Sequence, residues 1–567
     1  MEQGSSAGDV ADPVAGPHSG LGELHANREK IKAYIQSITQ PEEKQEQEEE
    51  SKPRKSKARK SKARPVVREE EKNKFGEVFT PNKLINDMLD KLPKEVWRDP
   101  NKKWLDPATG FGNFPMVVYE RLMEGLADHP DYKDLAIRSE HIITQMLYMV
   151  EYNQVSCDKI QSIFGTSANL FCGSFVNQDE PIRFPDETTQ FDVIVGNPPF
   201  NADQTHEGKK GGGKNLWPEF VNKSLDIIVP GGYLLFVHPA LWRKPPSSRA
   251  KTLFDKMVHD NHMLYLEIHS KPDGFRDFGV QTRYDYYVIQ KRRPTPSRDF
   301  TTVKDQLGQE HELDLSRWRF LPNYSFEKIE PLLSGKEEDY VIFSRGQYGS
   351  DKEWVHDSKD DEYKFPLVHS TPLDGPRIYW SSKKNDDCKD CKKMFGVPKL
   401  IFGESGINNV IIDDKGEYGM TQGAIGLKIP GEGEGEIMKN VLKSDEFHRI
   451  LDAMSFSNFR IDWRMFIYFL PDFYKHGQFV SMAPFVRPSV LKKTAARARD
   501  PMAFVQSKRA RNEPSKTTPS KITPEKTRKS KTTPSKTTPS KTRKSKTPLL
   551  YSEGGRKRNS RYTRKKY

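Results

Sequence analysis

The sequence predicts an α/β protein in which a parallel sheet is followed by a second, mixed α+β domain, with a charged arm at each end. Three observations carry this prediction. Between residues 103 and 237, short apolar runs alternate with helix-like segments, as in a parallel sheet with crossover helices. From about residue 293 to 490 the pattern changes to Gly-rich turns, short strands and aromatic-rich segments. Outside this core no hydrophobic period is present, so both ends are expected to be disordered.

The elements of the sheet follow one another in a regular order. The strands expected first are short apolar runs, and they cover residues 103–106, 145–151, 169–172 and 191–196. Helices are expected to begin at Phe114, at Asn153 and near Leu216, and the last of these ends at about Ile228. A further strand covers residues 232–237. The alternation of these segments indicates parallel strands joined by helices.

The charge of the chain is unevenly distributed. The boundaries expected from composition are an N-terminal arm (1–70), an α/β domain (71–295), an α+β domain (296–490) and a Lys/Thr/Pro/Ser-rich tail (491–567). The net charge is +13, but residues 507–567 hold 21 Lys and Arg against three acids, which leaves −5 for the rest. Such an arm binds DNA phosphates, or serves as a solvated linker or an import signal.

The composition excludes several classes of protein. With 567 residues, 34% of them hydrophobic and 31 of them Phe, the chain can build a sizeable core. It has four cysteines, no apolar run of membrane-spanning length and no leading signal segment. We therefore expect a soluble intracellular protein of a reducing compartment, in cytoplasm or nucleus, without membrane contact and without disulfides.

The first strand ends in a turn that is suited to a ligand. Residues 105–114 read LDPATGFGNF, with Asp106 at the strand end and Ala108, Gly110 and Gly112 leading into a helix. Glycines let a ligand approach the backbone, and a helix N-terminus offers N–H donors and a positive dipole end. A purely structural turn would use the same residues. The full dinucleotide-binding pattern is absent, because Phe114 stands close to where a third small residue is required.

The next two strands also end in polar or small residues. Glu151 ends the second strand, where α/β folds place an acid that binds ribose hydroxyls, although an acid at a strand end also occurs without function. The third strand is followed by Gly173 and Ser174. Since parallel strands end at the same edge of a sheet, these residues are expected to lie near one another.

The fourth strand ends in Asn197-Pro198-Pro199-Phe200. Two prolines fix φ at successive positions and remove two N–H donors, so the backbone is rigid and its carbonyls remain as acceptors. Asn197 adds an amide and Phe200 adds a flat apolar face. This set can hold a planar ring with a polar edge. The alternative is a tight turn with a core Phe.

In this order the motifs resemble those of the S-adenosylmethionine-dependent adenine-specific DNA methyltransferases. The motifs are GEVFTP at 76–81, DPATGFG at 106–112, Glu151, GSF at 173–175 and NPPF at 197–200, which we call the catalytic turn after the role that the resemblance implies. The resemblance covers about residues 72–300 and is strongest to the methylase part of type IIG restriction–modification enzymes, in which target recognition follows the cofactor motifs. It implies a Rossmann-like methyltransferase domain (71–295) and a target-recognition domain (296–490).

The resemblance also implies a cofactor, a substrate and roles for residues. The cofactor would be S-adenosylmethionine and the substrate double-stranded DNA, with no obligate protein partner. Phe79, Thr80 and Pro81 would contact the methionine part, and the backbone of residues 108–112 would wrap it. Asp106 would lie near the cofactor's amino group, and Glu151 would hold the ribose hydroxyls. The family commonly has a carboxylate where this chain has Ser174, so the contact to the cofactor's adenine differs here.

The implied reaction is site-specific methyl transfer to the N6 amino group of adenine. This nitrogen is a poor nucleophile because its lone pair is delocalised, and the base is stacked inside the duplex. The Asn197 side chain and the Pro198 carbonyl would accept hydrogen bonds from its two N–H groups and so direct its lone pair at the sulfonium methyl. Phe200 would stack on the flipped base. Catalysis would rest on positioning and hydrogen bonding, without a metal.

Three further patterns favour bland explanations. Residues 208–214, GKKGGGK, lack the Ser or Thr of a phosphate-binding loop. Asp186 together with residues 207–209 resembles the acidic motif of a restriction nuclease, but the catalytic turn lies between the two parts of that motif. Related bifunctional enzymes also carry the nuclease before the Phe-Thr-Pro turn. We expect no cleavage activity. Cys388 and Cys391 have the spacing of half a zinc site, with His369 as a possible third ligand, but an exposed loop is the simpler interpretation.

Two rival functions also fit these residues. The Asn-Pro-Pro-aromatic turn also serves glutamine methylation in release factors, so a protein or RNA methyltransferase is one alternative. A catalytically silent DNA-binding protein is the other, because of the departure at Ser174. A large region after the catalytic domain favours the DNA enzyme over the first rival.

Overall fold

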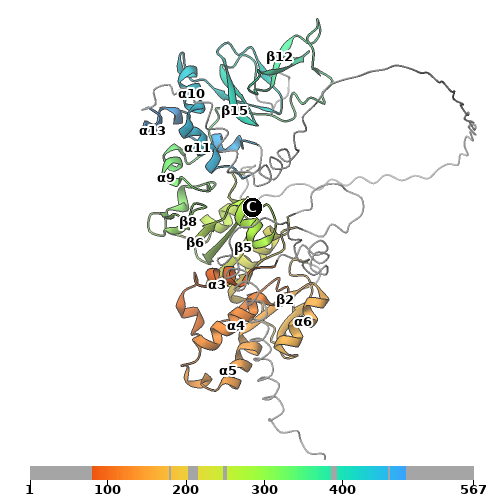
Figure 1. The fold of residues 1–567 in the computed structure, drawn as a ribbon, viewed down its shortest axis with the longest axis vertical. Coiled ribbons are helices and arrows are strands. Elements are labelled where there is room, and N and C mark those ends of the chain that lie inside the picture. The colour runs from red at the N-terminus through yellow and green to blue at the C-terminus, as the bar shows by residue number, and fades with distance from the viewer. Residues whose placement is uncertain are drawn as a thin grey trace, which may run out of the picture. The chain divides into compact units, whose positions relative to one another are not determined.

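The computed structural model describes residues 79–177, 181–201, 215–246, 252–384, 393–456 and 460–480 (Figure 1). The chain divides into two units, residues 1–485 and residues 486–567, and every described residue lies in the first of them. Among the described helices, none is long and apolar enough to cross a membrane. The two predicted arms, residues 208–214 and the pair Cys388 and Cys391 lie outside the described residues.

A nine-stranded sheet forms the centre of the α/β domain. Its strand order is β3-β2-β1-β4-β5-β7-β6-β8-β9. The bounds are β1 (Trp104–Asp106), β2 (Leu147–Glu151), β3 (Asn169–Cys172), β4 (Phe191–Gly196), β5 (Ile228–Pro239), β6 (His262–Ile268), β7 (Tyr284–Gln290), β8 (Thr301–Lys304) and β9 (Glu310–Leu313). The strands from β3 to β5 are all parallel, and β7 runs antiparallel to both β5 and β6. The predicted α/β class and the Rossmann-like sheet are thus confirmed.

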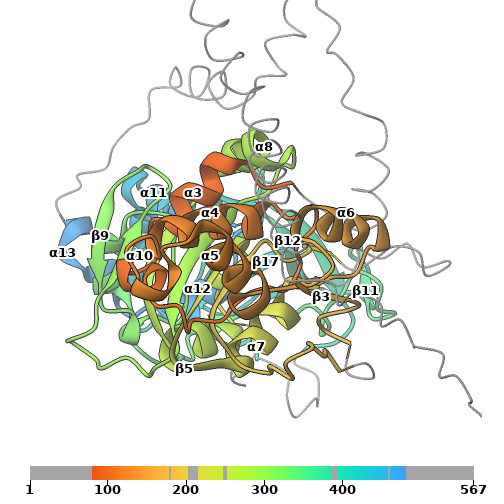
Figure 2. The same ribbon diagram turned by 90° about the horizontal axis from the view of Figure 1, so that it is seen from below.

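Helices cover both faces of this sheet (Figure 2). They are α3 (Asn82–Leu89), α4 (Asn113–Gly125), α5 (Leu135–His141), α6 (Gln154–Phe164), α7 (Trp217–Ile227) and α8 (Lys271–Phe278). Apolar side chains of α3, α4, α6 and α8 pack with Trp104 and Met149, whereas α7 packs with Leu105 and Val150. Successive strand residues point to opposite faces, so each strand contributes to two cores.

The helix starts follow from local capping. The Asn153 side chain accepts a hydrogen bond from the Val155 N–H at 3.1 Å and caps α6. Gly112 precedes α4 in the left-handed conformation, with φ of +91°, and no side chain caps this helix. The first turn of α4 therefore presents its backbone donors without a side-chain acceptor.

The C-terminal region, which begins at Leu315, contains two four-stranded sheets of order β10-β17-β14-β15 and β11-β13-β12-β16. Their strands are β10 (Val341–Ile342), β11 (Val355–His356), β12 (Phe365–Ser370), β13 (Arg377–Ser381), β14 (Lys399–Gly403), β15 (Gly406–Asp413), β16 (Gly419–Met420) and β17 (Ala424–Lys428). The helices are α9 (Phe326–Ile329), α10 (Glu434–Lys443), α11 (Asp445–Ala453), α12 (Arg464–Ile467) and α13 (Gly477–Val480). This region is mixed α+β, as predicted.

Short 3-10 or π turns connect the larger elements. They are η1 (Lys94–Trp97), η2 (Pro130–Tyr132), η3 (Ile142–Met146), η4 (Ala240–Arg243), η5 (Asp255–His259), η6 (Leu315–Arg317), η7 (Glu330–Leu332) and η8 (Phe473–Lys475). The π turn η3 takes the place of the first residues of the strand expected at 145–151, which begins at Leu147.

The large sheet extends beyond residue 295, where the change in sequence pattern places the domain boundary. β8 pairs in parallel with β6, and β9 pairs with β8. A buried arginine then joins the sheet to the C-terminal region: Arg243 binds Asp285 through Nε at 2.7 Å and Nη2 at 3.0 Å. The same guanidinium donates to the carbonyls of Leu321 and Pro322 and to Asn323 Oδ1.

The expectation of no disulfides is wrong. Cys157 of α6 and Cys172 at the end of β3 are bonded through their sulfur atoms, with their Cα atoms 6.1 Å apart. The two residues are 15 positions apart in the sequence and belong to different elements. Only the packing of α6 beside β3 brings them together, and composition alone does not reveal this.

Candidate active site

The predicted ligand residues meet at one edge of the sheet. Asp106 ends β1, Glu151 ends β2, Ser174 follows β3, and Asn197 follows β4. These four strands are neighbours in the order β3-β2-β1-β4, and Glu151 is paired in register with Cys172. The strand order reverses between β1 and β4, where open α/β sheets bind ligands beyond the strand ends.

Glu151 organises the glycine turn. Its Oε2 accepts a hydrogen bond from the Gly110 N–H and its Oε1 accepts one from the Asn153 N–H, both at 2.7 Å. Gly110 has φ of +56°, a backbone conformation that is strained for residues with a side chain. The buried carboxylate therefore ties the end of β2 to the turn that leads into α4. The sequence predicted a ligand contact for Glu151 but not this contact with the protein backbone.

Asp106 is almost completely buried beside the catalytic turn. Its Oδ1 accepts a hydrogen bond from the Ala108 N–H at 3.1 Å. A Cβ atom at position 196 would lie 2.8 Å from this oxygen, so Gly196 provides the space for the carboxyl group. Burial raises the pKa of Asp106 to about 8, and the charge of Glu151 adds to the effect. A ligand ammonium at this position would favour the ionised form.

This raised pKa leads to a prediction about stability. The folded protein binds the Asp106 proton more tightly than the unfolded chain, so the free energy of unfolding should fall as pH rises from about 4 to about 8. Asp106→Asn removes this loss. At pH 9, denaturant unfolding should show the variant to be more stable than the parent by at least about 1 kcal/mol, with a smaller difference at pH 5.

The control for this experiment is Asp128→Asn, which changes an exposed aspartate after α4. Its effect on unfolding should be small and should not grow between pH 5 and pH 9. A constant difference between Asp106→Asn and the parent over this range would show that Asp106 does not keep its proton in the folded protein.

A hydrogen bond joins the Phe-Thr-Pro turn to the catalytic turn. The Asn197 Nδ2 donates to Thr80 Oγ1 at 3.0 Å, and Thr80 is buried. Thr80 lies two residues before α3. This bond orients the amide with its nitrogen toward Thr80 and its oxygen, the acceptor, on the opposite side. The sequence placed Thr80 at the cofactor and did not predict its contact with Asn197.

The catalytic turn is packed firmly at its end. Phe200 is buried and contacts Phe278 of α8 edge to face, with ring centroids 6.0 Å apart. The Phe200 carbonyl accepts a hydrogen bond from the Leu216 N–H, and Asn201 pairs with Asn215 as an isolated bridge. The chain thus leaves the site at Asn201 and returns to it at Asn215, which begins the path into α7.

Residues after β2 and β3 complete this part of the edge. The Ser174 Oγ accepts a hydrogen bond from the Asn177 N–H at 3.2 Å, so it shapes its own turn. The Gly173 N–H donates to the Glu151 carbonyl at 2.8 Å. Tyr152, directly after Glu151, is 66% exposed and presents an aromatic ring at the edge. Sequence reasoning missed this ring, because a single aromatic behind an acid forms no pattern.

Two residues of the alternative patterns have structural partners. Asp186 accepts hydrogen bonds from Lys103 at 2.9 Å and from Tyr148 at 2.5 Å. Burial would raise the pKa of Asp186, but hydrogen bonds, that of Thr188 above all, hold it well below its usual range. His369 lies 2.7 Å from Thr421 Oγ1 through its Nδ1. In the described part of the chain no group of three metal-binding side chains is present.

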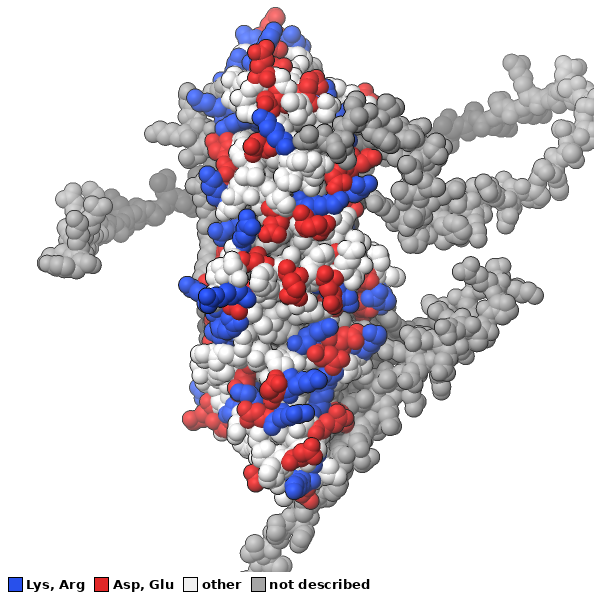
Figure 3. Space-filling view, turned by 90° about the vertical axis from the view of Figure 1, so that its left-hand side faces the viewer, with Lys and Arg blue, Asp and Glu red and all other residues white. Residues whose placement is uncertain are grey.

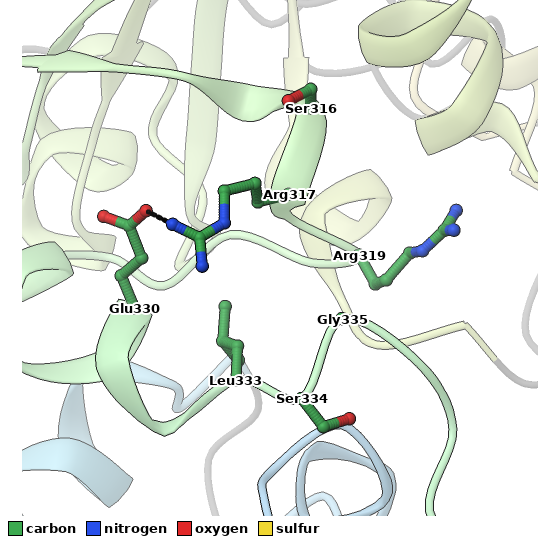
Figure 4. A pocket seen from close by; sticks show the side chains of 7 residues that line it. All are labelled: Ser316, Arg317, Arg319, Glu330, Leu333, Ser334 and Gly335. Atoms are coloured by element: carbon green, nitrogen blue, oxygen red, sulfur yellow. Dashed lines mark hydrogen bonds and ion pairs between the residues drawn. The ribbon is translucent and has the colours of Figure 1, made fainter. Parts of the chain in front are cut away.

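A cavity of about 330 Å³ lies in the C-terminal region, between residues 316 and 335 (Figure 4). Arg317 points into it and pairs with Glu330 at 3.4 Å, whereas Arg319 points away and pairs with Asp255 at 3.4 Å. The cavity contains none of the predicted site residues. The candidate active site is therefore the sheet edge.

Comparison with known proteins supports the resemblance seen in the motifs. A family model described as Eco57I restriction-modification methylase matches residues 133–272. A curated protein of Mycoplasma pneumoniae, described as an uncharacterized adenine-specific methylase, is 24% identical over an alignment of 313 residues that covers 42% of this chain and 73% of that protein. The resemblance to adenine-specific methyltransferases is confirmed.

Solved structures that match part of this chain include two restriction–modification proteins. The EcoKI M protein, a type I restriction enzyme component, has a TM-score of 0.31 and 15% identity, covering 41% of this chain. This chain spans about half of that protein, 48% of its length. The type IIL restriction–modification enzyme MmeI in complex with DNA has a TM-score of 0.36 and 11% identity, covering 76% of this chain and 70% of MmeI.

Proposed function

We propose that this chain is a site-specific DNA methyltransferase that transfers a methyl group from S-adenosylmethionine to the N6 amino group of adenine, without nuclease activity. The observation that carries the proposal is the arrangement at the sheet edge. Asp106 and Glu151 lie at the ends of β1 and β2, and the catalytic turn follows the neighbouring strand β4. The family match and the name of the Mycoplasma pneumoniae relative support the same reaction.

The residues at the ends of β1 to β3 suit the cofactor. The first turn of α4, which no side chain caps, offers backbone N–H groups for the methionine carboxylate. Asp106 would accept from the ammonium group, and Glu151 would accept from the ribose hydroxyls with the lone pairs that the backbone leaves. The Ser174 hydroxyl would meet the adenine edge, with Phe79, Thr80 and Pro81 nearby. When bound, the cofactor supplies a methyl group on a positively charged sulfur.

The catalytic turn would activate the target amino group. The Asn197 amide oxygen and the Pro198 carbonyl would accept hydrogen bonds from its two N–H groups, which localises the nitrogen lone pair. Pro199 keeps the backbone rigid, and Phe200 packs against the extruded base. Because the Thr80 hydroxyl already holds the Asn197 nitrogen, the amide is oriented before the substrate arrives. The C-terminal region, predicted from the sequence to span residues 296–490, would recognise the DNA site.

Identification of the methylated product tests the proposal. Purified protein is incubated with S-adenosylmethionine labelled in the methyl group and with unmethylated genomic DNA, total RNA or a protein extract. We expect label in DNA, and in N6-methyladenine after digestion to nucleosides. Label in RNA or protein alone would support the rival methyltransferases, and no transfer to any substrate would support the silent DNA-binding protein.

The basic tail should add affinity without specificity. Residues 507–567 hold a net charge of +18 with no apolar pattern in their sequence, which favours neutralisation of phosphates over readout of bases. A chain ending near Ala503 should bind duplex DNA more weakly at low salt. Each lost phosphate contact lowers the slope of log affinity against log salt by about 0.9, so the slope should be shallower by several units.

Two outcomes would contradict this role for the tail. An unchanged salt slope would make it a targeting or protein-binding segment. A changed set of methylated sites in the truncated protein, mapped on the same DNA, would mean that residues beyond 503 take part in recognition.

A further inference from the structure

Three cations line the half of the sheet edge that the cofactor residues do not occupy. Lys244 follows β5 and η4, Lys271 follows β6 as the first residue of α8, and Arg283 directly precedes β7. β7 is antiparallel to its neighbours, so its first residues lie at the same edge as the last residues of β5 and β6. Along the edge these cations continue the row that begins with Asn197 after β4.

These cations lack the partners that such groups require. Within the described residues, no carboxylate lies within 4.0 Å of Lys244, Lys271 or Arg283, and the two lysine ammonium groups make no hydrogen bond there. Arg283 donates through Nη1 to the neutral amide of Gln306, and its buried Nε makes no hydrogen bond in the described part of the chain. All three side chains are partly buried. Burial lowers the pKa of each.

The carboxylates near these cations are already engaged. Asp285 binds Arg243 at 2.7 Å. Asp462, which lies near Lys244, is paired with Arg464. Asp452, which lies near Arg283, accepts a hydrogen bond from the Tyr324 hydroxyl at 2.8 Å. These groups therefore give the three cations only weak compensation.

Other cations whose pKa burial lowers are provided with acceptors. Lys399 is paired with Asp413 at 2.5 Å, Lys223 donates to the Phe175 carbonyl, and Lys291 donates to the Leu225 carbonyl. Partial burial of a charge without a partner costs free energy, and this cost is offset when an anion binds. The contrast indicates that Lys244, Lys271 and Arg283 have a ligand outside the described chain.

The described surface shown in Figure 3 carries Lys and Arg intermixed with Asp and Glu, without a broad area of one sign. Anion binding by this face would therefore have no general positive field to rely on. At the sheet edge, specific unpartnered cations can serve instead.

Adjacent strands lie about 4.8 Å apart, so the ends of β5, β7 and β6 span about 10 Å. At a rise of about 3.4 Å per nucleotide, this is the length of about three nucleotides.

We propose that Lys244, Lys271 and Arg283 form a phosphate-binding row that holds the DNA backbone next to the target adenine. The proposal rests on the proposed function and identifies the residues that position the strand at the catalytic turn. With the cofactor at β1 to β3, the row places the substrate backbone on the opposite side of Asn197. The three groups contact phosphates and would position the target strand without reading its sequence.

The test compares two charge-matched triple variants of the full chain. The row variant is Lys244→Gln, Lys271→Gln and Arg283→Gln. The control is Lys94→Gln, Arg98→Gln and Lys133→Gln, which removes exposed cations that precede β1 and α5, away from the carboxyl ends of the strands. Affinity for a fluorescent DNA duplex is measured by anisotropy over a range of KCl concentrations, and cofactor affinity by calorimetry.

The row variant should show a salt slope about 2.7 shallower than the parent, the value for three lost phosphate contacts, while the control changes much less. Its affinity for S-adenosylmethionine should be unchanged. Its melting temperature should be equal to or above that of the parent, since the substitutions remove partly buried, unpaired charges. A lower melting temperature with an unchanged slope would make the three residues structural and would overturn the proposal.

The outcomes also separate this proposal from the proposed function. If the parent methylates DNA but the row and control variants have equal salt slopes, the phosphate row is wrong and the methyltransferase assignment stands. If the parent protein transfers no methyl group, and only the row variant has a shallower salt slope than the parent, the chain binds DNA at this edge without catalysing the proposed reaction.

Discussion

Asn197→Ala should lower the rate of methyl transfer by at least about two to three orders of magnitude while cofactor affinity changes little. The substitution removes the amide oxygen that would accept a target N–H bond. It leaves Asp106 and Glu151, which would hold the cofactor, in place. Single-turnover kinetics on genomic DNA gives the rate, and calorimetry with S-adenosylmethionine gives the affinity.

Three further substitutions separate the chemistry from a general disturbance of the turn. Asn197→Asp keeps an oxygen acceptor that the Thr80 hydroxyl can hold, so it should retain more activity than Asn197→Ala. Thr80→Val removes the acceptor for the Asn197 Nδ2 and should lower the rate, whereas Thr80→Ser should restore it. An undiminished rate of methylation by Asn197→Ala would contradict the assignment of the catalytic turn.

Glu151→Ala should weaken S-adenosylmethionine binding by roughly 1.5 to 3 kcal/mol, the scale of a charge-assisted hydrogen bond. This corresponds to a dissociation constant roughly 10 to 150 times higher. Two effects contribute to the loss. The ribose hydroxyls lose their acceptor, and the Gly110 N–H loses the carboxylate that holds the glycine turn.

Glu151→Gln provides the intermediate case. The glutamine amide keeps one oxygen acceptor, but its nitrogen cannot accept a hydrogen bond. One of the two hydrogen bonds that Glu151 accepts, from the Gly110 N–H or from the Asn153 N–H, is therefore lost. Calorimetry should therefore place its affinity between those of the parent and Glu151→Ala. Equal affinities for the parent and the alanine variant would mean that Glu151 has only a local role in the protein.

The sequence predicts the parallel strands well because they are marked by local pattern. The expected strands at 169–172 and 191–196 coincide with β3 and β4, and Asn153 caps α6 as the expected helix start requires. Each of these depends on residues within a short window. The adjacency of the strand ends then follows from the general rule for parallel sheets.

Contacts between different elements could not be predicted from the sequence, because no local pattern marks them. The Thr80–Asn197 hydrogen bond joins residues 117 positions apart, and the Cys157–Cys172 bond depends on how α6 packs beside β3. β8 and β9 lie past the predicted boundary at residue 295, since pairing with β6 decides their sheet. The absence of a carboxylate beside Lys271, among the residues that the structure describes, likewise follows from tertiary packing.

Single-molecule sequencing of DNA from cells that express the protein tests the central claim most directly. The cells should lack other adenine methylation, and a parallel culture should express Asn197→Ala. We expect N6-methyladenine in one defined sequence context with the parent protein and none with the variant. Unmodified adenines in both cultures, with both proteins present in folded form, would contradict the assignment of this chain as an adenine-specific DNA methyltransferase.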